Sequence, residues 1–153
     1  VSYATAKAAV IGLTRSLTVA GAPHGIKVNL LAPAAMTRMA GQPAAAAAPP
    51  SASADVKAGG AAIAAAMASD AVAPMAAFLA HEDCPVSGEI YAAGAGRFAR
   101  IFIGVTEGHV HPGPSTPTVE DVSANWDAIN DEKAYYLPTD LPSWSDVFLD
   151  HLR

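Results

Sequence analysis

A tyrosine and a lysine near the start of the chain are the residues whose types and spacing could do chemistry. Tyr3 and Lys7 are four positions apart, and on a helix this spacing places both side chains on one face, with Cβ atoms about 5–6 Å apart. A phenol has an ordinary pKa of about 10, and a neighbouring ammonium group favours its ionised form. The pair could therefore serve as a general acid and base, although the same spacing also arises by chance on helices.

The elements that must position this pair follow from hydrophobic periodicity. Apolar residues recur every three or four positions over 3–20, which predicts an amphipathic helix that Gly21 ends. The apolar segment IKVNLLAP, 26–33, is predicted to be a strand buried on both faces, as in a parallel sheet. A second helix is predicted over 70–80 and a strand in GEIYAAG, which ends at Gly94; the stretch ARIFIGV extends that strand or follows it.

Three motifs, in matching order and spacing, resemble those of the short-chain dehydrogenase/reductase family. The first is Tyr-x-x-x-Lys within YATAKAA, continued by GLTRSL; the second is VNLLAP at the end of the predicted strand; the third is GEIYAAGAG. The resemblance covers roughly residues 1–105. It implies an α/β fold, namely the C-terminal portion of a Rossmann-type, doubly wound parallel sheet, followed by a short helical extension.

The same resemblance implies an NAD(P)-dependent oxidoreductase that moves a hydride between the cofactor and a carbonyl or alcohol carbon. Tyr3 would be the proton donor to the carbonyl oxygen, or the acceptor from the alcohol. Lys7 would lower the pKa of that tyrosine and hydrogen-bond the ribose hydroxyls of the nicotinamide. The substrate would be a small carbonyl or alcohol compound, and the discrimination between NAD and NADP stays open.

The segment after the predicted strand would line the nicotinamide pocket. Thr37 would contact the carboxamide or the phosphates, and the neighbouring cofactor-binding positions would be Pro33, Ala34 and Ala35. The family usually has Pro-Gly here, with a threonine five residues beyond the proline, whereas this chain has Pro33-Ala34 and a threonine four residues beyond. Arg38 therefore competes with Thr37 for this neighbourhood.

Motifs that the family carries before its tyrosine have no match in this sequence. There is no T-G-x-x-x-G-x-G turn for the pyrophosphate, no N-A-G, no upstream serine, and the first residue is valine. We therefore expect the C-terminal part of a longer oxidoreductase, inactive by itself and a homo-oligomer when intact. The alternative is a non-catalytic assembly module or a gene remnant, because the family's Tyr/Lys helix packs against its counterpart in a partner subunit.

Two further segments bear on the substrate. The alanine-rich, low-complexity stretch 41–68 falls where the family places its mobile substrate lid. The sequence after the last strand is similar to the branch that includes the (3R)-hydroxyacyl-CoA dehydrogenase unit of peroxisomal multifunctional enzymes, which suggests a hydroxyacyl-CoA or steroid-like substrate. From His109 onward the composition changes to a proline-rich stretch that contains HPGPSTPT, so 1–108 is assigned to the Rossmann-like domain and 109–153 to a proline-rich connector with a helical extension.

The C-terminal part contains two predicted helices and two nearby histidines. Thr118 and Asp121 have capping-box spacing, and Ser143 is a predicted N-cap of the last helix. His109 and His111 are predicted to be solvated loop residues, because two potential ligands without a third donor do not make a metal site. No metal is therefore assigned.

Composition narrows the class of protein. The formal net charge is −5 with scattered basic residues, which argues against a nucleic-acid partner. No run approaches the roughly 20 apolar residues that span a membrane, so a cytoplasmic protein is expected. Cys84 is the single cysteine, which excludes a disulfide within the chain.

Overall fold

The computed structural model describes residues 1–37 and 62–153. Residues 38–61, which include Arg38 and most of the predicted lid segment 41–68, lie outside the described residues. The chain divides into two compact units, Val1–Ile101 and Phe102–Arg153. The domain boundary predicted after residue 108 falls seven positions beyond the division between these units.

The first unit is a mixed α/β structure whose helix and sheet follow the predicted order. Helix α1, Ser2–Gly21, confirms the helix predicted over 3–20 and continues into a short 3₁₀ turn, η1, Ala22–His24. Strand β1, Leu30–Pro33, is shorter than the predicted 26–33. It pairs in parallel with β2, Ile90–Gly94, with Leu30 opposite Ile90 and Pro33 opposite Ala93.

The apolar stretch after β2 forms a separate strand. Strand β3, Arg97–Ile101, pairs antiparallel with β2 through a tight turn, with Gly94 opposite Arg97. The sheet order is β1-β2-β3. All five residues of β3 are exposed, so this strand is an open edge of the sheet.

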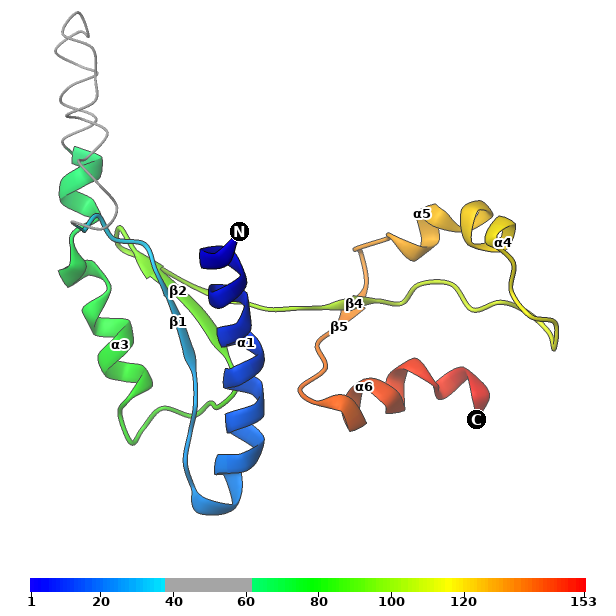
Figure 1. Ribbon diagram of the computed structural model, residues 1–153, viewed down its shortest axis with the longest axis horizontal. Coiled ribbons are helices and arrows are strands. Elements are labelled where there is room, and N and C mark those ends of the chain that lie inside the picture. The colour runs from blue at the N-terminus through cyan, green and yellow to red at the C-terminus, as the bar shows by residue number, and fades with distance from the viewer. Residues whose placement is uncertain (38–61) are drawn as a thin grey trace, which may run out of the picture. The chain divides into compact units, whose positions relative to one another are not determined.

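Helices α1 and α3 lie on either side of the β1–β2 pair (Figure 1). Helix α3, Ala73–Leu79, confirms the helix predicted over 70–80, and Pro74 sits in its first turn, where a proline costs no hydrogen bond. It follows the 3₁₀ turn η4, Ser69–Ala71 and a short helical segment at 62–66.

The core of the first unit is small. Its buried apolar side chains in the described ranges are Val72, Cys84, Ile90 and Ala93, and Cys84 is fully enclosed. Thr14 is the buried residue at the centre of α1, with 5% of its surface exposed. The Thr18 hydroxyl shares its proton between the carbonyl oxygen of Thr14 in the same helix, at 2.9 Å, and that of Val28, at 3.2 Å, and so joins α1 to the segment before β1.

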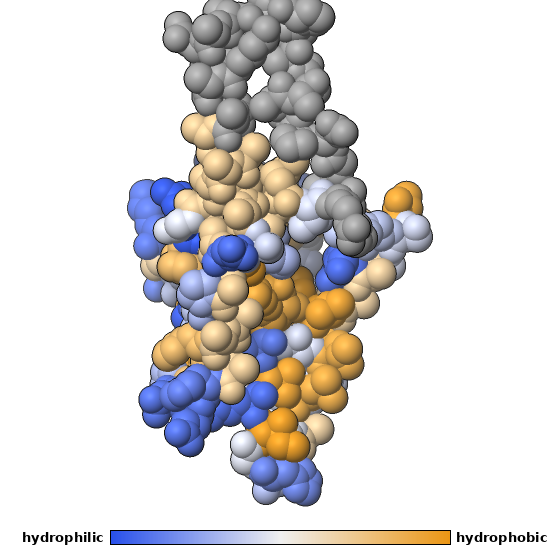
Figure 2. Space-filling model, turned by 90° about the vertical axis from the view of Figure 1, so that its left-hand side faces the viewer, coloured by the Kyte–Doolittle hydropathy of each residue, from blue (hydrophilic) through white to orange (hydrophobic). Residues whose placement is uncertain are grey.

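The predicted apolar stripe of α1 does not face this core. Val10, Leu13 and Leu17 are 39%, 55% and 45% exposed, because the buried face of the helix is the one that carries Thr14. Apolar side chains also gather in a band on the face of the molecule that Figure 2 presents. The described part of the chain therefore leaves much apolar surface uncovered.

The second unit consists of short elements. A two-stranded antiparallel ladder joins β4, Val105–Thr106, to β5, Tyr135–Tyr136. Between them lie α4, Val119–Ala124, and α5, Trp126–Ile129. The chain ends with α6, Leu141–Phe148, and a 3₁₀ turn η5, Asp150–Leu152.

One predicted helix start is confirmed and the other is wrong. Thr118 and Asp121 form the predicted capping box at the start of α4. Helix α6 is capped by Asp140 rather than Ser143, and Ser143 is the third helical residue that completes the box. The Asp140 carboxylate is the better acceptor for the free amide of the first turn, which explains the shift of the cap.

No helix in the described ranges has both the length and the apolar content required to cross a membrane.

Candidate active site

Tyr3 and Lys7 lie on the same face of α1, in its first two turns. The ammonium nitrogen Nζ of Lys7 is 5.5 Å from the centroid of the Tyr3 ring, within the range of a cation–π contact. Tyr3 is 70% exposed. The two side chains therefore share a helix face, as their spacing predicts, and both are exposed.

The N-terminus of α1 and the carboxyl end of β1 lie at the same end of the first unit (Figure 1), because the helix and the strand run in opposite directions. At this end the ladder extends one residue past β1, where the backbone N–H of Ala34 donates to the carbonyl oxygen of Ala93 at 2.8 Å. Ligands of open α/β sheets bind outside the carboxyl ends of the strands. The candidate site therefore lies at the carboxyl end of β1 and β2.

Gly94 allows an unusually close approach at the same edge. A Cβ atom built on Gly94 would lie 2.1 Å from the carbonyl oxygen of Ala34 and 2.8 Å from its Cβ atom. Both neighbours belong to the backbone or sit next to it, so they cannot rotate away. Sequence reasoning treated Gly94 only as the end of a strand; the glycine within GEIYAAG was the available signal for a close backbone contact.

Backbone hydrogen bonds at Ala34 and Met36 hold the segment that follows β1. Ala34 is held by the ladder, and the backbone N–H of Met36 donates to the carbonyl oxygen of Met67 at 2.8 Å. Thr37 is exposed. Its predicted role, like those of Pro33, Ala34 and Ala35, stays a prediction.

Asn29 fixes the start of β1 against the loop that precedes β2. Its Nδ2 donates to the carbonyl oxygen of Val86 at 3.0 Å, and its Oδ1 accepts from the backbone N–H of Glu89 at 3.2 Å. Ser87 Oγ accepts from the backbone N–H of Val28 at 2.9 Å. Asn29 stands in the family-like motif VNLLAP, but sequence reasoning gave it no role; the structure makes it a positioning residue for the two parallel strands.

The site can be compared with what a nicotinamide cofactor requires. Two features are compatible with the nicotinamide–ribose end of the cofactor. One is the exposed face of α1 that carries Tyr3 and Lys7, and the other is the backbone at Ala34, which lies next to Gly94. Gly94-Ala95-Gly96 comprises the last residue of β2 and the two-residue turn to β3 and is not the helix-opening, glycine-rich turn that binds a pyrophosphate. Among the described residues there is no group of three or more potential metal ligands.

Comparison with known proteins identifies the family. The model of a family described as "Enoyl-(Acyl carrier protein) reductase" matches residues 1–97. The chain belongs to the short-chain dehydrogenase/reductase family. A Mycobacterium tuberculosis protein named as a short-chain type dehydrogenase/reductase is 31% identical over 130 residues, which are 85% of this chain and 40% of that protein.

Two further proteins extend the comparison. The peroxisomal hydratase-dehydrogenase-epimerase of Saccharomyces cerevisiae is 29% identical over 131 residues, which cover 85% of this chain and 13% of that protein. The structure of full-length peroxisomal multifunctional enzyme type 2 from Drosophila melanogaster matches with a TM-score of 0.72 and 22% identity, covering 98% of this chain and 25% of that one. This structural likeness confirms the predicted α/β, Rossmann-like fold class. The chain spans less than half the length of each of these proteins.

Proposed function

We propose that this chain supplies the Tyr3–Lys7 half of the active site of an NAD(P)-dependent oxidoreductase that interconverts a carbonyl and an alcohol. The observation that carries the proposal is the position of this pair on one exposed face of α1, at the end of the unit where β1 and β2 terminate. Membership of the short-chain dehydrogenase/reductase family supports it. The match with a protein named as a hydratase-dehydrogenase-epimerase supports the dehydrogenase activity in this proposal, and the proposed substrate is a hydroxyacyl-CoA or a steroid-like compound.

In the proposed reaction the residues of this chain handle the proton. NAD(P) supplies or accepts the hydride when it is bound. The Tyr3 hydroxyl donates its proton to the carbonyl oxygen during reduction and accepts it from the alcohol during oxidation. The ammonium group of Lys7 stabilises the negative charge that develops on the phenolic oxygen and hydrogen-bonds the ribose hydroxyls. Lys7 must leave the face of the Tyr3 ring for this, a rotation that an exposed side chain makes within nanoseconds.

The segment after β1 holds the nicotinamide in this proposal. Pro33, Ala34 and Ala35 provide a backbone wall whose position is fixed by the hydrogen bond between Ala34 and Ala93. Thr37 offers a hydroxyl to the carboxamide or to a phosphate. The sequence contains no glycine-rich turn for the pyrophosphate, so we expect the 153-residue chain alone to show no measurable oxidation of NADH or NADPH.

A hybrid protein tests the proposal directly. The part of the Mycobacterium tuberculosis relative that precedes the aligned region is joined to Val1, and cofactor binding is first confirmed by fluorescence titration. Reduction of a 3-ketoacyl-CoA and of a steroid ketone is then followed by NAD(P)H absorbance. Replacing the general acid in Y3F should lower kcat at least about 100-fold, and T37V should raise KM for the cofactor.

Two outcomes contradict the proposal. One is a hybrid that binds cofactor and reduces substrate equally well with phenylalanine in place of Tyr3. The other is efficient NAD(P)H oxidation by the isolated 153-residue chain, since that would require a complete cofactor site within it.

The K7R variant is the matched control for charge: it keeps a cation at this position and should lose less activity than K7M.

A second candidate function is a non-catalytic assembly module. The exposure of Val10, Leu13 and Leu17 along α1 favours it, because an apolar helix face of this kind is typical of a surface that another protein covers. Light scattering coupled to size exclusion, with L13D and L17D as disruptive variants, measures assembly. Self-association combined with the absence of cofactor binding in the hybrid would favour this module, whereas activity in the hybrid favours the enzyme. A homo-oligomer is part of both proposals.

We also propose a cytoplasmic location for the protein. The relative from Saccharomyces cerevisiae is named as peroxisomal, so the two compartments are the alternatives to separate. Fluorescence microscopy of the intact protein tagged at its N-terminus distinguishes them: diffuse signal supports the proposal, and punctate signal that coincides with a peroxisomal marker contradicts it.

A further inference from the structure

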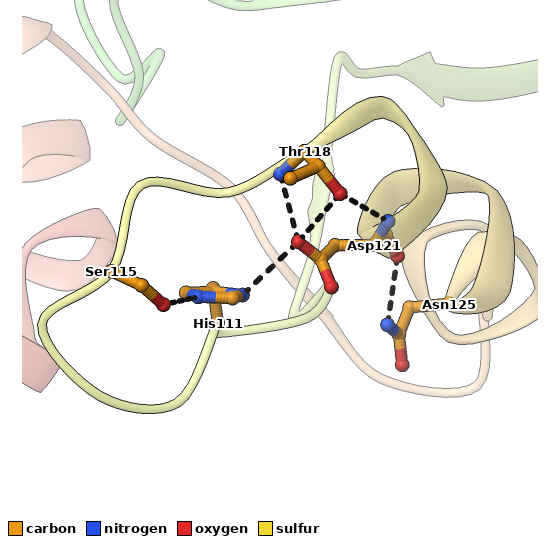
Figure 3. A network of polar contacts seen from close by, with 5 residues as sticks. All are labelled: His111, Ser115, Thr118, Asp121 and Asn125. Carbon is orange, nitrogen blue, oxygen red and sulfur yellow. Dashed lines mark hydrogen bonds and ion pairs between the residues drawn. The ribbon is translucent and has the colours of Figure 1, made fainter.

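Both ring nitrogens of His111 face polar side chains of the second unit (Figure 3). Its Nε2 lies 2.9 Å from the hydroxyl oxygen of Ser115, and its Nδ1 lies 3.8 Å from Oδ2 of Asp121. The histidine side chain is only 19% exposed. The prediction that both histidines of this loop are solvated is therefore wrong for His111, which joins the proline-rich loop 109–117 to the first turn of α4.

The Asp121 carboxylate is already committed to the start of the helix. Its Oδ2 accepts from the backbone N–H of Thr118 at 2.8 Å and from the Thr118 hydroxyl at 2.9 Å. These hydrogen bonds, the backbone one first, lower the pKa of Asp121 below its ordinary value, and His111 and then His109 contribute smaller electrostatic effects in the same direction. The carboxylate thus remains charged throughout the pH range in which histidine side chains ordinarily change charge.

The arrangement has the order of a hydrolytic Ser–His–Asp triad but lacks its geometry. A triad requires the carboxylate to accept a hydrogen bond from the histidine Nδ1–H, and the 3.8 Å separation of Nδ1 from Asp121 is too long for one. The facing oxygen is also occupied by Thr118. The contact is an ion pair whenever the imidazole is protonated, and this makes it a connection rather than a catalytic relay.

We infer that His111 is a pH-sensitive clasp that fastens loop 109–117 to the first turn of α4 when its imidazole is protonated. The neutral ring retains only the hydrogen bond to Ser115, which lies within the same loop. The protonated ring adds the attraction to Asp121, which lies on the helix, so acidification ties the two segments together. Within the described residues, the titratable groups that act electrostatically on this carboxylate are His111 and, from the same loop, His109.

Backbone ¹⁵N relaxation of the full chain tests the clasp at two pH values. The probes are the loop amides of Gly113, Ser115 and Thr116. Between about pH 8 and about pH 5.5, their order parameters should rise by at least about 0.1, toward the value of about 0.85 that is typical of rigid backbone. The rise should be absent in H111Q, which keeps a polar side chain of similar reach but cannot become charged.

Two further variants make the experiment specific. H109Q is the matched control: it removes the neighbouring histidine of the same loop and should keep the rise. D121N should abolish the rise while its amide oxygen still accepts from Thr118, so that α4 keeps its cap; far-UV circular dichroism checks this. If D121N unfolds α4, H111Q alone decides the question. Equal loop order at both pH values in the unmodified chain, or a rise that persists in H111Q or vanishes in H109Q, would overturn the inference.

Discussion

Replacing Gly94 by alanine should loosen the end of the sheet that carries the candidate site. The added Cβ atom would lie 2.1 Å from the carbonyl oxygen of Ala34 and 2.9 Å from its carbonyl carbon, so one backbone must move away from the other. Overpacking of this kind costs about 1–3 kcal/mol. Loss of the hydrogen bond from Ala34 to Ala93 adds about 1 kcal/mol. The combined destabilisation of this edge is therefore about 2–4 kcal/mol.

The exchange rate of the Ala34 amide measures this effect locally, without requiring the two units to unfold together. A destabilisation of about 2–4 kcal/mol accelerates exchange roughly 30- to 800-fold. Gly12 offers a matched control, because it lies inside α1 and an added Cβ would meet no described atom within 4 Å apart from its chain neighbours and the backbone of its own helix. Gly12→Ala should stabilise the helix by about 0.5–1 kcal/mol. Unchanged exchange of the Ala34 amide in G94A would refute the reasoning, since it would mean that the close approach imposes no constraint.

Three other predictions concern the framework. Asn29→Ala removes both hydrogen bonds to the loop before β2, and we expect a loss of about 1–3 kcal/mol in urea unfolding; an unchanged midpoint would contradict this. Arg100 makes a two-pronged ion pair with Glu89, with N–O distances of 2.8 Å; because the pair is partly exposed, R100Q should cost about 0.2–1 kcal/mol, a difference that should shrink in high salt. Hydrogen bonds from Ser143 lower the pKa of Asp140 below 3.8, so the stability that this cap gives to α6 should persist above that pH and be lost as pH falls through the folded-state value. Circular dichroism should show a smaller acid-induced loss of helix in D140N than in the native chain, because within the described residues D140N leaves only the Asp121 cap of α4 to be lost on acidification.

The pattern of apolar residues predicted which segments form elements better than it predicted which faces are buried. The helix over 3–20 and the strand within GEIYAAG are both present. Yet Leu13 and Leu17 are exposed while Thr14 is buried. Periodicity marks a face as apolar without naming what covers it, so the stripe could not be assigned to this unit from the sequence.

Local chemistry explains the remaining difference at the start of α6. Serine and aspartate are both favoured at the N-cap position. In a capping box the N-cap residue comes three positions before its partner, so of these two residues only Asp140 can be the cap. The structure uses the aspartate as the cap and the serine as its partner. A capping-box search over this segment, rather than a search for single caps, would have found the correct start.

The candidate site depends on contacts between parts of the chain that sequence motifs treat separately. Tyr3 and Lys7 belong to one motif, Asn29 to a second and Gly94 to a third. The structure brings the second and third motifs into contact at both ends of the parallel strand pair. At its beginning Asn29 hydrogen-bonds residues 86–89, and at its end Gly94 closely approaches Ala34. Register errors in a parallel pair move every residue of a strand together. A change at either end of this pair should therefore displace the wall that follows β1, even though neither residue carries a reactive group.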